Sequence, residues 1–281
     1  MFVNVSLSEA ARRAKLPSLR TEGLVRVVAR EADGCTRAIE VAEAGPLRVR
    51  FPRLGAGKRL EAITLNTAGG IAGGDRLAVS VEAADRAEIV VTSQAAEKIY
   101  RAAGAPSRIA LTLKAGPHAS IDWLPQETIL FDRARVARRI DVDTAADARV
   151  TLCEAIVFGR AAMGERMQTG LVRDHWRICR NGKLVFADAL RVEGAIEEIL
   201  ARRAVAKGAH AIATIVRVAP DAEAWCEALR AVFDPEVEAG ASAFDGILVA
   251  RLIARDGFAL RRAIVAALCA IGSPPPRAYL L

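Results

Sequence analysis

The sequence predicts a mainly β protein whose many short strands form a large sandwich, a barrel or a layered, coiled sheet, followed by a small α+β part with two helices. Short runs alternate between apolar and polar residues with the period of two that a strand requires, from residue 23 onward. Gly, Pro or Asp interrupts these runs at a spacing of roughly ten residues. Only near the end of the chain do longer runs with helical signals appear.

Residues 1–20 are rich in Ala and Arg and contain Pro17, and we expect them to form a weakly ordered basic arm. Residues 21–207 predict a β-rich body. In "RNGK" the pair Asn181 and Gly182 predicts a two-residue hairpin turn between two alternating runs. The predicted strands include "GLVRVVAR", "TRAIEVAEAG", "PLRVRFPR", "AITLNTAGG", "DRLAVSVEAA", "AEIVVTSQAAEKIYRA", "SRIALTLKAG", "ASIDWLP" and "ARVTLCEAIVFGR".

Residues 208–281 predict the order βαββα. After the strand "AIATIVRVA", a helix is expected from Asp221 to about Phe233, with Asp221 as its N-cap after Pro220. Two strand-like runs, "EVEAGASAF" and "GILVARLIA", lead to a second helix in "DGFALRRAIVAALCAIG", which Gly272 and three prolines close. We expect this part to pack on the β body.

The chain carries a net charge of +7, mostly from arginines in runs such as "RARVARR" at 133–139 and "ARRAVAK" at 201–207. We interpret most of these runs as solvated faces, although a basic excess favours an acidic partner. The sequence has no helix-turn-helix, zinc-finger or RNA-recognition signature, and only 5% of its residues are aromatic. A protein partner therefore ranks above nucleic acid.

The five cysteines are widely spaced, odd in number and without a CxxC motif, which indicates reduced thiols rather than a disulfide framework or a zinc knuckle. The first residues lack the apolar core of a signal peptide, and the sequence has no uncharged apolar run of about eighteen residues. We therefore expect a cytoplasmic protein without a membrane segment.

A glycine-rich segment, "LNTAGGIAGGDRL", lies between two predicted strands. Between Asn66 and Asp75 it contains Gly69, Gly70, Gly73 and Gly74. The first and last of these have the spacing of a P-loop, but Asp75 and Arg76 stand where Lys and Ser or Thr are required. A dinucleotide fingerprint is excluded too, because no G-x-G pair is present and a strand follows instead of a helix. We interpret the glycines as a structural motif that supplies positive φ or close chain approach at a corner between strands.

The sequence shows no closed metal site. The histidines, His118, His175 and His210, are far apart, and none lies in an HxxH or HExxH motif. His175 and Cys179 share a strand face by parity, but four residues of strand separate them by roughly 13 Å, too far to bind one ion. No GxSxG motif and no activating context for a cysteine is present. We therefore predict no catalytic residues and no tightly bound cofactor.

Several carboxylates lie inside otherwise apolar strands. Glu154 has the parity of Leu152 and Ile156, so a charge is buried if that face is buried, and it then needs a cation, a partner or water. A strand edge or a solvated face is the alternative for each of them. The set comprises Asp122, Glu127, Asp132, Asp141, Asp143, Glu154, Glu165, Asp174 and Asp188.

Four blocks occur in an order and at a spacing found together in one protein family. They are "LNTAGGIAGGDRL" (65–77), "TSQAAEKIYRA" (92–102), "IDWLPQETILFDRA" (121–134) and "FGRAAMGE" (158–165). In these blocks the chain resembles the urease accessory protein family UreD, also called UreH. Its end, "PPPRAYLL", keeps Pro276 and Arg277 of the family's Leu-Pro-Arg-Val-Trp-like segment but lacks the tryptophan.

The resemblance implies a single domain over residues 21–281 with a helix-like layering of strands, and a scaffold or chaperone that is not an enzyme. It further implies that the protein binds apo-urease and the accessory proteins UreF and UreG, the latter a GTPase, and assists nickel delivery to the urease active site. A scaffold of this kind should pass nickel transiently along water and carboxylates, because a closed His and Cys site would trap the ion.

On this basis we expect Asp75, Glu154 and Asp188 to line or border a hydrated nickel path through the β body. The two C-terminal helices, at 221–233 and 258–271, are expected to offer protein-binding surface together with "RARVARR". Two other functions stay open. One is a β-rich hydrolase that uses Glu127 and Asp132 as an acidic pair, whose spacing fits no known acid/base geometry by itself. The other is a basic nucleic-acid-binding protein, whose affinity would fall steeply with salt.

Overall fold

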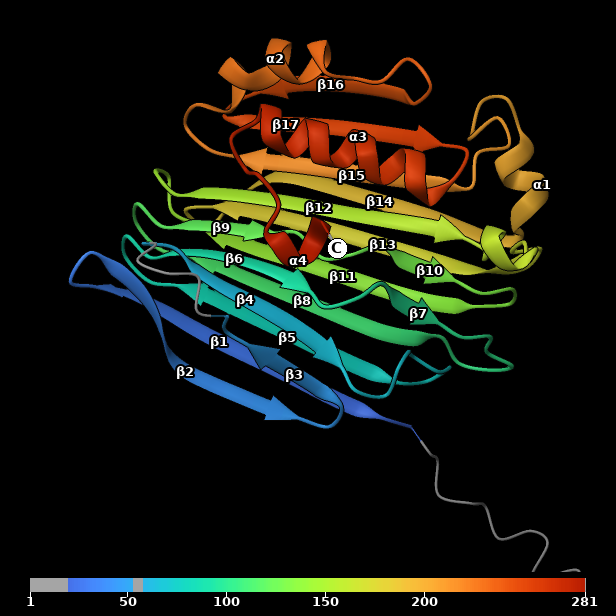
Figure 1. Cartoon of the computed structure of the whole chain (residues 1–281), viewed down its shortest axis with the longest axis horizontal. Coiled ribbons are helices and arrows are strands. Elements are labelled where there is room, and N and C mark those ends of the chain that lie inside the picture. Colours follow the sequence, from blue (N-terminus) through green and yellow to red (C-terminus); the bar gives the residue numbers. More distant parts are fainter. Residues whose placement is uncertain (1–19, 53–57, 281) are drawn as a thin grey trace, which may run out of the picture.

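A computed structural model describes residues 20–52 and 58–280, so all but the last residue of the predicted basic arm, 1–20, lie outside the described part. The described chain is mostly strand and forms two sheets that lie over one another (Figure 1). The seven-stranded sheet runs, in order, β14 (Lys183–Ala195), β13 (Thr169–Arg180), β11 (Arg135–Thr144), β8 (Ser107–Ala115), β5 (Arg76–Ala83), β1 (Glu22–Ala32) and β2 (Cys35–Ala44). These sheets confirm the prediction of a mainly β, layered protein.

The second sheet has ten strands within the described ranges. In order they are β16 (Glu238–Phe244), β17 (Ile247–Ala254), β15 (Ala211–Val218), β12 (Arg149–Phe158), β9 (Ser120–Trp123), β6 (Glu88–Ser93), β4 (Leu60–Asn66) and β3 (Leu47–Arg50), with β10 (Thr128–Leu130) beside β12 and β7 (Glu97–Ile99) beside β10. The helices are α1 (Ile196–Ala201), α2 (Cys226–Ala231), α3 (Gly257–Ala270) and α4 (Arg277–Leu280), and the short 3-10 turns are η2 (Ala161–Met163) and η3 (Ala222–Trp225).

The chain passes back and forth between the two sheets. Strands β4, β6, β9 and β12 belong to the ten-stranded sheet, and β5, β8, β11 and β13 alternate with them in the other sheet. Each pairs in parallel with the next strand of its own sheet, so the chain forms a helix of stacked coils. The offset between partner residues changes from coil to coil, as the pairs Arg76–Arg108 and Arg108–Ala137 show. The sequence consequently has coils without a repeat of fixed period.

The period-two alternation places aliphatic side chains in the space between the sheets. In β11, for example, Val136, Ile140 and Val142 are buried in this core while Arg139 is exposed. Strand β12 is buried along most of its length, because the core between the sheets covers one face and a second apolar cluster covers the other. Burial of this apolar surface is the main stabilising term of the fold.

The C-terminal part continues the ten-stranded sheet through β15, β17 and β16, and α3 lies across its outer face (Figure 1). Leu260, Ile264 and Leu268 recur at helical spacing on the buried face of α3 and belong to the second apolar cluster. The helix begins after Asp256, whose carboxylate accepts a hydrogen bond from Ala259 N at 2.8 Å. This arrangement confirms the βαββα order.

The first C-terminal helix is shorter than the predicted range 221–233. It consists of η3 followed by α2, and the Asp221 side chain precedes η3 without making a capping bond. Helices α1 and α4 were not predicted, since each is only a few residues long. The hairpin is confirmed: Asn181 and Gly182, with φ of 50° and 76°, join β13 to β14. Within the described ranges, no helix has the length and apolar character to cross a bilayer.

Candidate functional site

A buried ionic cluster joins the two sheets in the middle of the aliphatic core. Arg138 of β11 donates from Nε to Oδ1 of Asp174, at 2.9 Å, and from Nη2 to the other oxygen of that carboxylate. Its Nη1 donates to Glu154 of β12 in the opposite sheet. The remaining oxygen of Glu154 accepts a hydrogen bond from Trp123 Nε1 at 2.8 Å. The Arg138, Glu154 and Asp174 side chains are each at most 8% exposed, so all three charges lie in the interior.

The strand period explains why these polar groups point inward. Arg138 lies between Val136 and Ile140 on the inward face of β11, and Asp174 has the same position relative to Trp176 on β13. The two are direct cross-strand partners in the parallel register. Glu154 is buried, as its parity with buried neighbours allowed, so the alternative of a solvated face is wrong for this residue.

One guanidinium serves two carboxylates in this cluster, so the three groups together carry one excess negative charge when all are ionised. Burial raises the pKa of Glu154, nearby Asp174 raises it further, and Arg138 opposes the rise without cancelling it. Burial by itself would lower the pKa of Arg138, but the two carboxylates outweigh it and raise that pKa above its ordinary value. The cluster therefore favours a bound proton or a cation at Glu154.

The cluster lies between two cavities. One, of about 300 Å³, is lined by Asn66, Ile71, Glu97 and other residues of the first coils, and it reaches Arg138 and Glu154. The other, of about 180 Å³, is lined by the same Arg138 and Glu154 and extends to Asp188. Since both cavities share these two side chains, we describe them together as a passage, which is lined mostly by apolar side chains and has the ionic cluster between its two halves.

Each cavity has a further carboxylate in its wall. At the far side of the smaller cavity, Asp188 of β14 forms an ion pair with Arg251 of β17 at 2.9 Å, which links the two sheets again. At the larger cavity, Glu97 accepts hydrogen bonds from Asn66 Nδ2 at 3.1 Å. Burial raises the pKa of Glu97, and the bond from Asn66 opposes the rise. Carboxylates thus line both cavities and the place where the two cavities meet.

The glycine-rich segment forms a tight corner at the larger cavity. Gly69, Gly70 and Gly74 have φ of 74°, 158° and 90°. A Cβ on Gly70 would lie 2.5 Å from the Tyr100 ring, and the Tyr100 hydroxyl donates to Gly69 O at 2.8 Å. A Cβ on Gly73 would lie 2.5 Å from Ala102 Cβ. These approaches bring the corner against the chain around Tyr100, with Asn66 and Gly69 in the cavity wall.

The structure brings Glu154 and Asp188 to one cavity but places Asp75 elsewhere. The Asp75 carboxylate accepts hydrogen bonds from Thr21 N and Ala72 N, each at 2.8 Å, and it lines neither cavity in the part of the chain described. Asp75 therefore fastens the glycine-rich corner to the start of β1. Its place on a metal path stays a prediction.

The acidic pair suggested for a hydrolase is engaged in other contacts. Glu127 is buried and accepts from Arg261 Nε at 2.8 Å, on the side of the sheet where α3 packs. Asp132 accepts from Gln168 N and Thr169 N at 2.8 and 3.1 Å, which holds a loop. Neither carboxylate lines the passage, so the geometry does not support a shared acid/base role.

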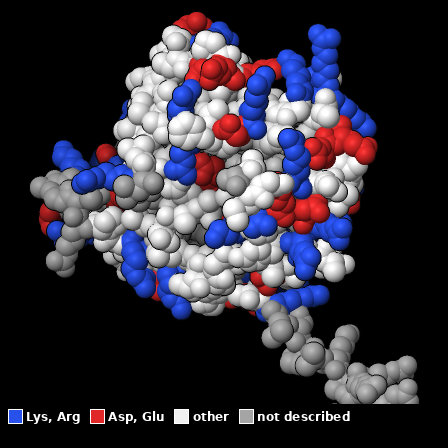
Figure 2. Space-filling view, turned by 45° about the vertical axis from the view of Figure 1, so that its right-hand side comes forward, with Lys and Arg blue, Asp and Glu red and all other residues white. Residues whose placement is uncertain are grey.

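Over residues 20–52 and 58–280, no group of three or more His, Cys, Asp and Glu side chains has the geometry to hold a metal ion. His210 lies near the surface with Nε2 2.6 Å from Arg166 Nη1, and burial followed by the Arg166 charge lowers its pKa. On the face seen in Figure 2, acidic side chains lie among the Lys and Arg side chains, so the basic excess does not form one continuous patch there.

Arg138 is the residue that the sequence-based interpretation missed. It was counted in "RARVARR" as part of a solvated face, which holds for Arg133 and Arg139 but is wrong for Arg138. The signal was present, because an arginine at the parity of Val136 and Ile140 predicts a buried cation. Of the carboxylates considered, the buried ones are Asp122, Glu127, Glu154 and Asp174, and the half-buried or exposed ones are Asp132, Asp141, Asp143, Glu165 and Asp188.

Comparison with known proteins gives one consistent result. The model of the family "UreD urease accessory protein" matches residues 21–277. A protein of Methylobacterium sp. (strain 4-46) named "Urease accessory protein UreD" is 49% identical over 268 residues, which cover 92% of this chain and 95% of the relative. Proteins of the same name from Rhodopseudomonas palustris (strain BisB18) and Azorhizobium caulinodans are also 49% identical, with 93% of this chain and 94% and 97% of the relatives covered.

Proposed function

The chain belongs to the UreD family of urease accessory proteins, and from this premise we propose that it is a scaffold or chaperone of urease maturation rather than an enzyme. In this role it assembles with apo-urease and the accessory proteins UreF and UreG in the cytoplasm. UreG is expected to join through the complex and to supply the GTP chemistry. The scaffold assists delivery of nickel to the urease active site, and nickel is its cargo rather than a resident cofactor.

The observation that carries the nickel role is the buried ionic cluster between two cavities of the aliphatic core. A buried carboxylate that shares its guanidinium with a second carboxylate is an unusual group to keep between two apolar sheets, because removing charge from water is costly. The excess negative charge at Glu154 offers a divalent cation an oxygen ligand. Arg138 opposes tight binding of the same cation, and the adjoining cavities are large enough for water. Weak and transient contact suits an ion that must be released.

We assign the steps of the path to three carboxylates. Glu97 lines the larger cavity, Glu154 lines both cavities, and Asp188 lines the smaller one. Asp188 is held by Arg251, so a passing cation would compete with that arginine for the carboxylate. Asp75 is the weakest member of the predicted set, since both of its oxygens accept backbone hydrogen bonds.

The scaffold role also needs surfaces for partners, and the C-terminal helices supply one. Phe258 on α3 is 73% exposed, with the Arg262 guanidinium 5.8 Å from the centre of its ring, and Val232 after α2 is 38% exposed. Exposed apolar side chains of this size are candidates for a protein interface. We propose that this surface docks the UreF-like partner.

The test is co-expression of urease and the accessory proteins with and without this chain, followed by measurement of nickel per active site and of urease activity. Full activation without the chain would overturn the maturation role. The double variant Glu154→Gln/Asp188→Asn is expected to assemble normally but to deliver less nickel. The matched control Asp141→Asn/Glu238→Gln changes two surface carboxylates and should deliver nickel like the parent. Unchanged nickel in the passage variant, with the complex assembled, would reject the path.

Docking by the C-terminal helices is tested with Phe258→Ser rather than by truncation before residue 221. Such a truncation removes β16, β17 and α3 and with them most of the second apolar cluster. Phe258 is mostly exposed, so the substitution should leave the fold intact and reduce co-purification of the UreF-like partner. Phe244→Ser, at an exposed position of the edge strand β16, is the control. Undiminished co-purification of Phe258→Ser would reject this docking surface.

A further inference from the structure

The outer face of the seven-stranded sheet carries a groove whose exposed arginines the maturation role does not use. A hollow of about 720 Å³ crosses β1, β5, β8, β11 and β13, and a neighbouring one of about 380 Å³ continues to β14. They share Arg139 and His175, so they form one groove across the sheet. Its floor is made of small side chains, Ala78, Ala110 and Ala137, while long arginine side chains form its walls.

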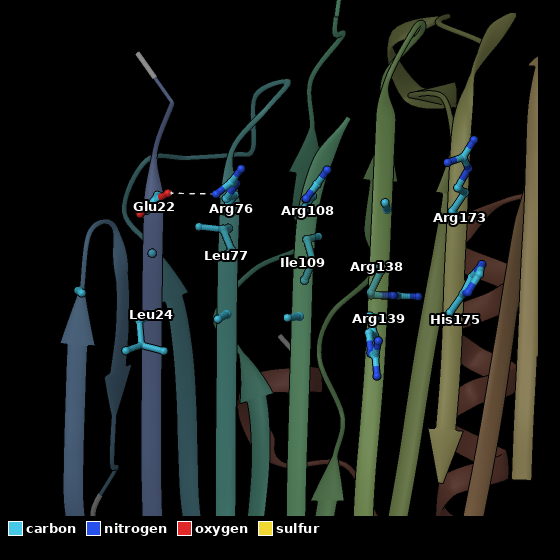
Figure 3. Close-up of a pocket in the computed structure, with 15 residues that line it drawn as sticks. Glu22, Leu24, Arg76, Leu77, Arg108, Ile109, Arg138, Arg139, Arg173 and His175 are labelled. Atoms are coloured by element: carbon cyan, nitrogen blue, oxygen red, sulfur yellow. Dashed lines mark ion pairs between the residues drawn. The ribbon is translucent and has the colours of Figure 1, made fainter. Parts of the chain in front are cut away.

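Because of the strand register, the groove arginines Arg76, Arg108 and Arg173 lie in one lateral row, which Arg191 continues beyond the groove lining. Arg76 pairs with Arg108, Arg108 with Ala137, Ala137 with Arg173, and Arg173 with Arg191. Figure 3 shows Arg76, Arg108 and Arg173 at the same level on three strands, with their side chains pointing the same way. Since neighbouring strands are about 4.8 Å apart, Arg76 and Arg173 are separated by roughly 14 Å across three strand spacings.

The row has more positive than negative charge. Within the described residues the Arg108 side chain forms no hydrogen bond or ion pair, although the backbone N of Arg108 donates to Asp75 O at 2.8 Å, and Arg173 Nε is buried without a hydrogen-bond partner. Glu22 lies 3.7 Å from Arg76 at one end of the row. At the other end Glu193 forms ion pairs with Arg173, at 3.5 Å, and Arg191, at 2.7 Å, and also with Arg135 outside the row, at 3.8 Å. Two carboxylates therefore face four guanidiniums, which leaves donors for an acidic ligand.

We propose that this groove binds an acidic, extended segment of a partner protein, with carboxylates at alternate positions. Alternate side chains of an extended chain lie roughly 6.8 Å apart, so three of them span roughly 14 Å, the separation of Arg76 and Arg173. Guanidiniums pair with carboxylates through paired, charge-assisted hydrogen bonds. The alanine floor lets a backbone approach the sheet closely between the arginines.

The groove favours a polypeptide over nucleic acid. Among the described residues, Trp176 is the only Phe, Tyr or Trp that lines either hollow, and its side chain is buried in the core, so the exposed His175 is the one ring that the groove offers to a base. The carboxylates Glu22 and Glu193 at its two ends would repel a continuous phosphate backbone. They are compatible with a short acidic segment that stays between them.

The experiment uses the full chain and a fluorescent peptide, acetyl-Gly-Glu-Ala-Glu-Ala-Glu-Gly-amide, measured by anisotropy at low ionic strength. The Gln-substituted peptide is the negative control. The variant Arg108→Gln/Arg173→Gln should lose roughly tenfold in affinity, because each exposed pair contributes modestly and the two add. Arg37→Gln/Arg86→Gln removes the same charge at the other end of the strands and should bind like the parent, and circular dichroism checks that both variants are folded.

Equal binding by the parent and the groove variant would overturn the proposal, as would an equal loss in both variants, which would indicate unspecific attraction. A single-stranded oligonucleotide of the same charge is tested in parallel. If it binds tenfold more tightly than the peptide and loses affinity only in the groove variant, the ligand is nucleic acid and the assignment to an acidic polypeptide is wrong.

Discussion

Removal of the Arg138 guanidinium tests the buried cluster most directly. In Arg138→Met the side chain keeps much of its apolar bulk, but Glu154 and Asp174 lose their shared cation. Glu154 would keep only its hydrogen bond from Trp123, and Asp174 would lose both bonds from Arg138. Two carboxylates that are almost fully buried would then be left without charge compensation.

The size of the effect follows from the burial of the partners. Breaking a buried ion pair by removing one member costs about 3–5 kcal/mol. The cavities on both sides of the cluster can admit water, which favours the lower end of that range. We therefore expect Arg138→Met to lower the free energy of unfolding by about 3 kcal/mol, a large part of the 5–15 kcal/mol typical of a domain.

The assay is urea unfolding followed by tryptophan fluorescence, since Trp123 donates to Glu154 and Trp176 lines the smaller cavity. The matched control is Arg139→Met, the next residue on the same strand. It is 65% exposed and paired with Asp141 on the outer face, so its loss should cost less than about 1 kcal/mol.

Further substitutions separate loss of the cation from loss of packing. Adding Glu154→Gln and Asp174→Asn to Arg138→Met removes the uncompensated charges and should restore part of the lost stability. If Arg138→Met were no less stable than Arg139→Met, or if the neutral replacements restored nothing, the description of the cluster as a set of mutually dependent buried charges would be refuted.

Three other perturbations have defined outcomes. Burial raises the pKa of Glu154 above 4.5, so the stability that its protonated form contributes is complete below the unfolded pKa and is lost as pH rises through the folded pKa. The free energy of unfolding of Glu154→Gln should therefore increase relative to that of the parent by up to about 1.4 kcal/mol per pH unit above about pH 4.5. Urea midpoints of the two proteins that differ equally at every pH would contradict this. Gly70→Ala places a Cβ against the Tyr100 ring and should lower the free energy of unfolding by about 1–3 kcal/mol. The control Gly104→Ala has open space around the new Cβ and should be nearly neutral. Equal thermal midpoints of the two variants would count against the close approach of Gly70 to Tyr100. Tyr279→Ala removes a fully buried side chain of the C-terminal helix α4 and should lower the free energy of unfolding, measured by urea titration, by about 3–5 kcal/mol. A decrease below about 1 kcal/mol would show that α4 is not packed there.

Much of the fold could be predicted from local pattern. The alternation in "RIDVDT" identifies a strand because a buried face requires it, and Asn181 and Gly182 identify a hairpin because both adopt positive φ. Strand pairing is different, since no local signal says that β5 pairs with β8 while β6, between them in sequence, joins the other sheet. Only the likeness to a family supplied the coiled layering.

The candidate site was predictable in part for the same reason. The parity of Glu154 indicated a buried carboxylate, but its partners come from other strands whose register the sequence does not specify. Asp188 was selected by position in a strand, and the structure places it at the end of the same cavity. Asp75 was selected as an anion beside glycines, and its hydrogen bonds to Thr21 N and Ala72 N depend on a backbone corner that composition cannot specify.

The stacked coils have a consequence for the order in which the chain is completed during synthesis. Each coil pairs mainly with the coil before it, so a nascent chain can add coils one after another as residues leave the ribosome. Arg138 emerges before Glu154, and Glu154 before Asp174. In this cluster the cation is therefore already present when each carboxylate is enclosed, whereas the buried Glu127 receives its partner Arg261 only after α3 is synthesised.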